Sequence, residues 1–270
     1  MKKVFWYINR LALLCVVCFR LLIYSLTHSK EIMKLLFSFY LTVNEFYQVS
    51  HGKSRNFQKT EMYKRLVKKK IFAESNVFNT DSNVARGIEI QALSGLVCGV
   101  APKTIFEIGT YHGFTTLHFA VNSPGDCQIY TLDLPLSHKN EQKEKMHEFS
   151  YDDMYIIELN MNNNGNRIYH NHPQAFKIKE LYGDSMRFDF SPYYGKIDFI
   201  YIDGNHSYPF VKSDTEKALK MLSKNGTIVW HDFDYIIHRD VFEYLNDFSK
   251  TYEIYSIPNT RFAIYGKNLV

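Results

Sequence analysis

Alternating strand-like and helix-like segments fill the chain from about residue 84 to its end. Short apolar runs typical of buried strands occur at residues 104–110, 127–135, 175–185, 196–204 and 226–233. Helical spacing of apolar positions occurs between them, at residues 83–100, 114–123, 207–224 and 240–251. Residues 252–266 read as two strands about a Pro-Asn turn.

This alternation predicts a doubly wound α/β fold, with helices on both faces of a mostly parallel, Rossmann-like sheet. We expect seven strands, of which the last two form an antiparallel C-terminal hairpin. The same pattern places one domain at residues 84–270 and leaves residues 1–83 as a separate N-terminal helical extension.

The N-terminal extension begins with basic residues followed by apolar ones. Arg10 and Arg20 flank its one uninterrupted apolar run, residues 11–19, and a second apolar stretch covers residues 33–47. A spanning helix needs about 20 apolar residues. Two interpretations therefore stay open: a membrane anchor or interfacial helix within residues 1–26, or a helical extension that packs on the body of the protein or on a second subunit.

Composition narrows the class of protein. The net charge of +4 is modest, and the basic run at residues 64–70 lacks interleaved aromatic residues, so we expect a solvated helix face and no nucleic-acid partner. Four cysteines in 270 residues give no disulfide framework. Cys15 and Cys18 lie inside an apolar run, where two small apolar residues are the simpler interpretation than a metal or redox pair. We expect a reducing, cytoplasmic location, with membrane association if residues 1–26 are an anchor.

Every predicted parallel strand ends next to a carboxylate. These residues are Glu107, Asp133, Asp184, Asp203 and Asp232. In a doubly wound sheet, ligands bind beyond the carboxyl ends of the strands. Loop caps would account for one or two of these acids, but five at one edge favour a polar binding site.

The first strand is followed by the pattern Glu107-x-Gly109-x-x-x-Gly113. A dinucleotide-binding site typically has the pattern G-x-G-x-x-G. Here the middle glycine is missing, and Tyr111 and His112 crowd the loop. Asp133 lies 24 positions after Gly109, a spacing that suits hydrogen bonds to ribose hydroxyls. The loop therefore suits a nucleoside ligand with a cationic end better than a nicotinamide dinucleotide.

The loop, Asp133, the Gly-Asp-Ser at residues 183–185 and the Asp-Gly-x-His after the fourth strand resemble a class I S-adenosylmethionine-dependent methyltransferase. The subgroup is the O-methyltransferase-like one called methyltransferase family 24, which is related to the catechol and caffeoyl-CoA O-methyltransferases. The resemblance covers about residues 84–267. It implies that the cofactor is bound by Glu107, Gly109, Thr110, Gly113, Asp133, Asp184 and Ser185. Within this set, Asp133 would bind the ribose and Asp184, with Ser185 beside it, the adenine.

The resemblance also implies an acceptor side. Asp203, His231 and Asp232 occupy positions that bind a divalent cation in the related metal-dependent enzymes, so we expect Mg²⁺ or Mn²⁺, with the histidine favouring a transition metal. The alternative is that the two aspartates only cap helices. His206 stands three residues after Asp203, where a base removes the acceptor proton, and we take His206 and Asp203 as the catalytic pair. A histidine bonded to the loop backbone is the alternative.

Residues 136–179 form a long insertion between the second and third strands. Its residues Tyr151, Tyr155, Tyr169, His170 and Phe176 are candidates for a lid over the acceptor, and a mobile asparagine-rich surface loop is the alternative. The resulting hypothesis is an enzyme that methylates a hydroxyl, with an amine as second choice, of a small molecule or sugar. A nicotinamide-dependent oxidoreductase and a non-catalytic cofactor-binding protein of the same fold are the rival hypotheses.

Overall fold

A computed structural model describes residues 55–68, 71, 73–75, 87–135, 158, 166–266 and 269. The chain divides into two compact units, residues 1–46 and 47–270. Every structural statement below concerns the second unit. The predictions for residues 1–26, including Cys15 and Cys18, lie outside the described residues.

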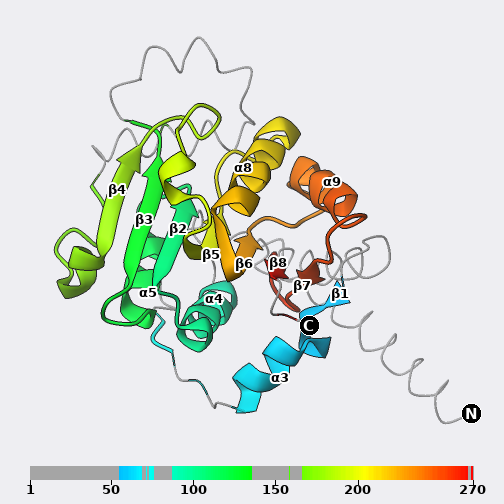
Figure 1. Ribbon diagram of the computed structural model, residues 1–270, viewed down its shortest axis with the longest axis horizontal. Helices are drawn as coiled ribbons and strands as arrows, with labels where there is room; N and C mark the ends of the chain where they lie inside the picture. The colour runs from blue at the N-terminus through cyan, green and yellow to red at the C-terminus, as the bar shows by residue number, and fades with distance from the viewer. Residues whose placement is uncertain are drawn as a thin grey trace, which may run out of the picture. The chain divides into compact units, whose positions relative to one another are not determined.

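One eight-stranded sheet organises the second unit, in the order β1-β7-β8-β6-β5-β2-β3-β4 (Figure 1). The strands are β1 Arg55–Asn56, β2 Thr104–Ile108, β3 Gln128–Asp133, β4 Ile178–Tyr182, β5 Ile197–Ile202, β6 Leu222–Trp230, β7 Tyr255–Ser256 and β8 Ala263–Gly266. All pairings are parallel except those of β8, which runs antiparallel to β6 and β7. The predicted doubly wound sheet with its antiparallel hairpin is confirmed.

The eighth strand, β1, was not predicted. It is two residues long and pairs in parallel with β7 at the edge of the sheet. A segment this short carries no readable alternation of apolar and polar positions. Only the tertiary pairing makes it a strand.

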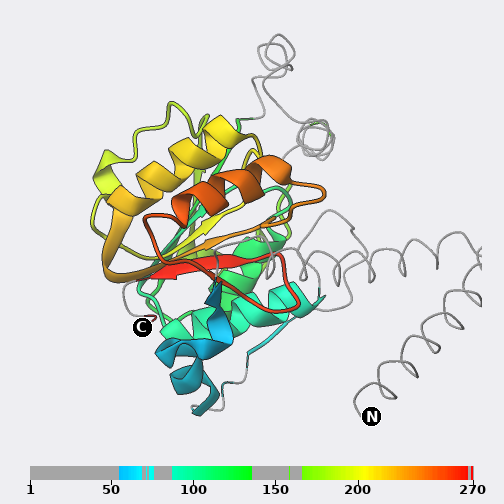
Figure 2. The same cartoon turned by 90° about the vertical axis from the view of Figure 1, so that its right-hand side faces the viewer.

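Helices cover both faces of the sheet, as Figure 2 shows. They are α3 Glu61–Lys68, α4 Gly87–Val100, α5 Phe114–Asn122, α8 Tyr208–Met221 and α9 Arg239–Phe248, with short 3-10 turns η1 Phe57–Lys59, η4 Pro173–Lys177 and η5 Ser191–Tyr193. The helices α8 and α9 lie on one face, and α4 and α5 lie on the other (Figures 1 and 2). The result is a three-layer arrangement.

Two hydrophobic clusters, one on each face, hold these layers together. Ile200 and Trp230 belong to the cluster under α8 and α9, and Phe199 and Phe119 belong to the one under α4 and α5. Alternate residues of β5 thus face opposite layers, which explains why this strand is apolar along nearly its whole length. Burial of this apolar surface on both sides is the main stabilising contribution to such a fold.

Residues near the start of the second unit take part in this core. Phe57 and Met62 are buried in the same cluster as Leu93 of α4. The basic residues Lys64 and Arg65 of α3 are exposed, which confirms the solvated face expected for this part of the basic run. The division at residues 83 and 84 stays a prediction, but the core already includes residues that precede it.

Within the part of the chain that the structure describes, none of the helices combines the length and apolar character that crossing a membrane requires.

Candidate functional site

In the loop after β2, the backbone comes very close to a neighbouring residue at two positions, and both positions are glycines. Gly109 has φ 94°, and a Cβ added there would lie 1.9 Å from the backbone oxygen of Asp203. Gly113 has φ 75°, and its Cβ would lie 2.3 Å from the ring of Tyr169. Both positions need glycine for conformation and for space. The predicted loop residues Gly109, Thr110 and Gly113 therefore form one rigid turn into α5.

Glu107 stands buried at the end of β2. Its Oε2 accepts hydrogen bonds from Thr116 Oγ1 at 2.5 Å and Thr131 Oγ1 at 2.6 Å, while its Oε1 has no hydrogen-bond partner. Burial raises the pKa of Glu107 to about 8, against the opposing effect of the two hydroxyl groups. Thr110 Oγ1 lies 2.5 Å from Thr131 Oγ1 and extends this network to the loop. At neutral pH the side chain is largely a neutral acid that can donate through its free oxygen.

Asp133, the predicted ribose ligand, is held by three groups. Its Oδ2 accepts from Arg167 Nη2 at 2.6 Å and from the backbone N–H of Tyr111 at 3.2 Å, and its Oδ1 accepts from the N–H of Leu134 at 2.8 Å. The Arg167 side chain is 1% exposed and that of Asp133 is 17% exposed. The carboxylate is thus fixed at the end of β3 and is partly exposed. Sequence reasoning missed Arg167, because it lies inside the long insertion and has no local signal.

The predicted adenine residues follow β4. Asp184 Oδ1 accepts from the N–H of Met186 at 2.9 Å, which closes a turn, and Ser185 is half-buried beside it. Asp214 of α8 is buried in this neighbourhood, and burial raises its pKa to about 7. The Lys217 Nζ donates to the backbone oxygen of Met186 at 2.9 Å and ties α8 to this turn.

On the acceptor side, the three predicted metal ligands come together. The three residues, here called the inner set, are Asp203, His231 and Asp232, and one ligand atom from each lies within 4.8 Å of the others. His231 Nδ1 lies 3.1 Å from Asp203 Oδ1 and 3.2 Å from Asp232 Oδ2. Asp232 adopts φ 55°, a left-handed conformation that is uncommon outside glycine and often found at functional sites.

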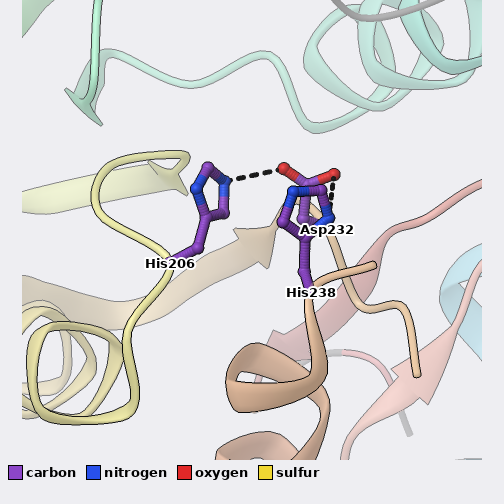
Figure 3. Close-up of side chains that lie close together, drawn as sticks. All are labelled: His206, Asp232 and His238. Atoms are coloured by element: carbon purple, nitrogen blue, oxygen red, sulfur yellow. Dashed lines mark hydrogen bonds and ion pairs between the residues drawn. The ribbon is translucent and has the colours of Figure 1, made fainter. Parts of the chain in front are cut away.

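A second group shares Asp232 with the first. This outer set consists of His206, Asp232 and His238, again with ligand atoms within 4.8 Å of one another. His206 Nε2 lies 2.8 Å from Asp232 Oδ2, and His238 Nδ1 lies 3.2 Å from Asp232 Oδ1 (Figure 3). His206 lies 4.0 Å from Asp203. The closest carboxylate to the predicted base is therefore Asp232, although the sequence pairs His206 with Asp203.

Two buried groups that the sequence did not suggest complete the centre. Arg261, from the turn between β7 and β8, donates from Nη1 to Asp232 Oδ1 at 2.5 Å and from Nε to Glu89 Oε1 at 3.1 Å. Glu89, from α4, also lies 3.4 Å from His231 Nε2. Both residues sit in segments without a motif, and only the fold brings them to the ends of β5 and β6.

The charges in this centre shift several pKa values. Burial opposes protonation of His231, but the carboxylates of Asp203 and Asp232 outweigh it and hold its pKa well above the ordinary value. Burial would raise the pKa of Asp232, yet His231 and Arg261 hold it well below the usual range. Burial lowers the pKa of His238 to about 4 despite the nearby carboxylate. A proton on His231 compensates the negative charge of Asp203 and Asp232, and a bound cation would compensate that same charge.

The described end of the long insertion lies against the loop after β2. Tyr169 packs on Gly113, and its hydroxyl donates to Glu180 Oε1 at 2.7 Å. The N–H of Ile168 donates to the backbone oxygen of His112 at 3.0 Å. Phe176 is exposed, and Tyr151 and Tyr155 lie outside the described residues. This end of the insertion therefore covers the predicted cofactor loop, while its role as a lid stays a prediction.

Residues 106–233 match a family model described as a methyltransferase domain. This part of the chain is a methyltransferase domain. The match covers the loop after β2 and the inner set, and it confirms the resemblance to class I S-adenosylmethionine-dependent methyltransferases. The comparison with curated proteins finds no match.

Several solved structures are similar to this chain over most of their length. The O-methyltransferase from Bacillus cereus in complex with SAH is 13% identical, covers 85% of this chain and 99% of its own, and has a TM-score of 0.46. The SAH-bound Podospora anserina methyltransferase PaMTH1 is 15% identical, with 88% and 96% coverage and a TM-score of 0.48. A putative caffeoyl-CoA O-methyltransferase from Staphylococcus aureus is 16% identical, with 83% and 99% coverage and a TM-score of 0.44.

The residues of the methyltransferase domain fit the groups that its family implies. For S-adenosylmethionine, the fit rests on the buried Oε1 of Glu107, which lacks a hydrogen-bond partner among the described residues, and on the carboxylate of Asp133, which is 17% exposed. For a divalent cation, the fit rests on donor chemistry, since carboxylate oxygens and imidazole nitrogens converge at the ends of β5 and β6.

Proposed function

We propose that this methyltransferase transfers the methyl group of S-adenosylmethionine to a hydroxyl of a small molecule or sugar. The observation that carries the proposal is the contact between Gly109 and Asp203. The loop that would hold the methyl donor packs on the backbone of the residue that begins the acceptor-side centre. The methyl donor and the acceptor hydroxyl would thus meet at one point, and transfer of a methyl group by direct displacement needs this alignment.

On the donor side, the chain supplies positions for a nucleoside with a cationic end. S-adenosylmethionine supplies an electrophilic methyl group on a positively charged sulfur. Asp133, held in place by Arg167, is an acceptor for the ribose hydroxyls. Glu107 donates or accepts through its free oxygen, and Gly109 lets the backbone approach the ligand closely.

On the acceptor side, a hydroxyl must lose its proton when it is methylated. Among the residues that the structure describes, the imidazoles and carboxylates at the ends of β5 and β6 can accept or hold that proton. An amine needs less help with deprotonation, so this concentration of proton acceptors favours a hydroxyl as substrate. A divalent cation belongs to the proposal, and the structure offers two donor sets for it, which share Asp232.

Calorimetric titration of the full chain with S-adenosylhomocysteine and with NAD⁺ tests the donor side. We expect binding of the first and none of the second, and the opposite result would favour an oxidoreductase. Incubation with S-adenosylmethionine and separate catechol and sugar hydroxyl acceptors then tests turnover, with S-adenosylhomocysteine formation as the readout. Binding of the cofactor without turnover of any acceptor would favour a non-catalytic binding protein.

A further inference from the structure

We propose that the outer set, His206, Asp232 and His238, holds a divalent transition-metal ion, in preference to the inner set read from the strand ends. The inference rests on the proposed function, because it assigns the cation of the acceptor side to particular residues. It also changes the role of His206 from base to metal ligand. Mn²⁺ and Zn²⁺ are the ions chosen to probe it.

The chemistry of the outer set suits such an ion. Two imidazoles and one carboxylate form a donor combination that Zn²⁺, Mn²⁺ and Fe²⁺ accept, whereas Mg²⁺ prefers oxygen ligands throughout. The rings of His206 and His238 lie side by side, with centroids 4.5 Å apart and planes at 34°. Each directs one nitrogen toward a different oxygen of Asp232, as Figure 3 shows.

His238 gives an independent indication that something is missing from this set. Its Nδ1 is buried and makes no hydrogen bond with any residue that the structure describes, although it lies 3.2 Å from Asp232 Oδ1. A buried polar atom without a hydrogen-bond partner is destabilising. His238 also directly precedes α9 without capping it through its side chain. A metal ion between the two imidazoles would give this nitrogen a partner.

The inner set is less suited to an ion because both nitrogens of its histidine already face other side chains. Both nitrogens of His231 face carboxylates, Nδ1 toward Asp203 at 3.1 Å and Nε2 toward Glu89 at 3.4 Å. The Arg261 guanidinium also lies 3.3 Å from His231 Nε2. These contacts satisfy His231 without a metal.

Access also favours the outer set. The side chains of His206 and His238 are 20% and 12% exposed, against 6% for His231. An ion bound by three protein ligands with an open side keeps coordination positions for water or for an acceptor hydroxyl. An ion on the outer set would therefore be reachable from outside, and its charge would favour the ionised form of that hydroxyl.

The remaining charge attracts a cation to this place. Glu89, Asp203 and Asp232 carry three negative charges, and Arg261 carries one positive charge, all within the same group of contacts. His231, whose two nitrogens both face carboxylates, adds a second positive charge, so an excess of one negative charge is left next to the outer set. A cation at the outer set would compensate that excess.

The test is a titration of the metal-stripped full chain with Mn²⁺ and with Zn²⁺, in the wild type and in three single variants. We expect His206→Gln and His238→Gln to weaken binding of both ions by at least about ten-fold, the usual minimum for loss of a metal-site partner. Asp203→Asn is the comparison variant, because it removes an inner-set ligand and one nearby negative charge but no outer-set ligand, and it should weaken binding less than either histidine variant does. Retained affinity in His238→Gln together with loss in Asp203→Asn would overturn the inference, as would a wild type that binds neither ion.

A second measurement does not depend on variants. Pulsed electron paramagnetic resonance of the Mn²⁺-loaded wild type counts coordinated imidazoles through their nitrogen couplings. The outer set predicts two and the inner set one, so a single imidazole contradicts the inference.

S-adenosylhomocysteine binding, measured on the same samples, separates this inference from the proposed function. If the wild type and all variants bind it but the metal pattern fails, the assignment of the cation is wrong and the methyltransferase proposal stands. If the metal pattern holds but nothing binds S-adenosylhomocysteine, the proposed function is wrong and the metal site stands.

Discussion

The backbone oxygen of Asp203 occupies the space in which a side chain at Gly109 would begin. The two residues directly follow the neighbouring parallel strands β2 and β5, and the N–H of Asp203 donates to the backbone oxygen of Ile108 at 2.8 Å. The contact fixes the distance between the loop that would hold the methyl donor and the cluster that would hold the acceptor. Any change at Gly109 therefore disturbs both halves of the site together.

Gly109→Ala should disrupt the cofactor loop. Alanine disfavours φ 94°, and its Cβ would collide with backbone that has no freedom to move away. We expect a lower melting temperature and loss of S-adenosylhomocysteine binding, measured by thermal unfolding and calorimetry. Gly95→Ala is the control, since a Cβ there meets nothing within 4 Å and the position lies inside α4. That variant should be slightly more stable, by roughly 0.5–1 kcal/mol.

Asp133→Asn should weaken S-adenosylhomocysteine binding by about ten-fold or more, because hydrogen bonds to a charged group contribute roughly 1.5–3 kcal/mol. Asparagine keeps an oxygen for Arg167, so the fold should persist. Calorimetric titration gives the affinity, and Asp126→Asn, at an exposed position outside the site, is the control. An unchanged affinity in the folded Asp133 variant would remove this residue from the cofactor site.

Glu107→Gln should alter how stability depends on pH. The pKa of Glu107 rises from an ordinary 4.5 to about 8 on folding, so between these values the folded state binds more protons than the unfolded one. This group therefore makes the wild type lose stability as the pH rises from about 4.5 to 8, by up to about 1.4 kcal/mol per pH unit. Urea unfolding across this range should show a flatter slope in the variant.

The control for that comparison is Glu216→Gln, whose side chain is exposed on α8. It should leave the slope of stability against pH unchanged. If Glu107→Gln follows the wild-type slope as well, the buried carboxyl is ionised at neutral pH.

Arg261→Met should destabilise the fold by about 3–5 kcal/mol, because it leaves the buried carboxylate of Glu89 without its cation. Arg239→Met is the control. Its partner Glu243 forms an exposed pair with it, and losing this pair should lower the free energy of unfolding far less than losing the buried one. The free energies of unfolding in urea give both values, and equal effects would mean that the buried group compensates its charge in another way.

Two shortened chains test where the folded unit begins. A chain starting at residue 47 keeps the whole second compact unit and should fold and bind S-adenosylhomocysteine. A chain starting at residue 70 lacks Phe57 and Met62 and should lose stability by several kcal/mol, since each leaves a cavity in the core. Thermal unfolding compares them. Failure of the first chain to fold would show that residues 1–46 belong to the core.

The sequence by itself determined the sheet and the position of the site. Apolar runs such as residues 196–204 are typical of strands covered on both faces, and parallel strands place their carboxyl ends at one edge. The carboxylates at the carboxyl ends of β2, β3 and β5 are therefore brought to the site by their positions in the strands, which can be read from the sequence. The loop after β2 was readable for the same reason, because its glycines are required by the turn itself.

Only the tertiary structure decided which side chains meet at that edge. Glu89 and Arg261 are 172 residues apart, and Glu89 and His231 are 142 apart. Asp232 rather than Asp203 became the partner of His206, because β6 runs beside β5 with Ile202 opposite Trp230, and the left-handed turn at Asp232 directs its carboxylate toward that loop. Such contacts depend on strand register and on backbone turns that several elements fix together, and no stretch of the sequence contains them.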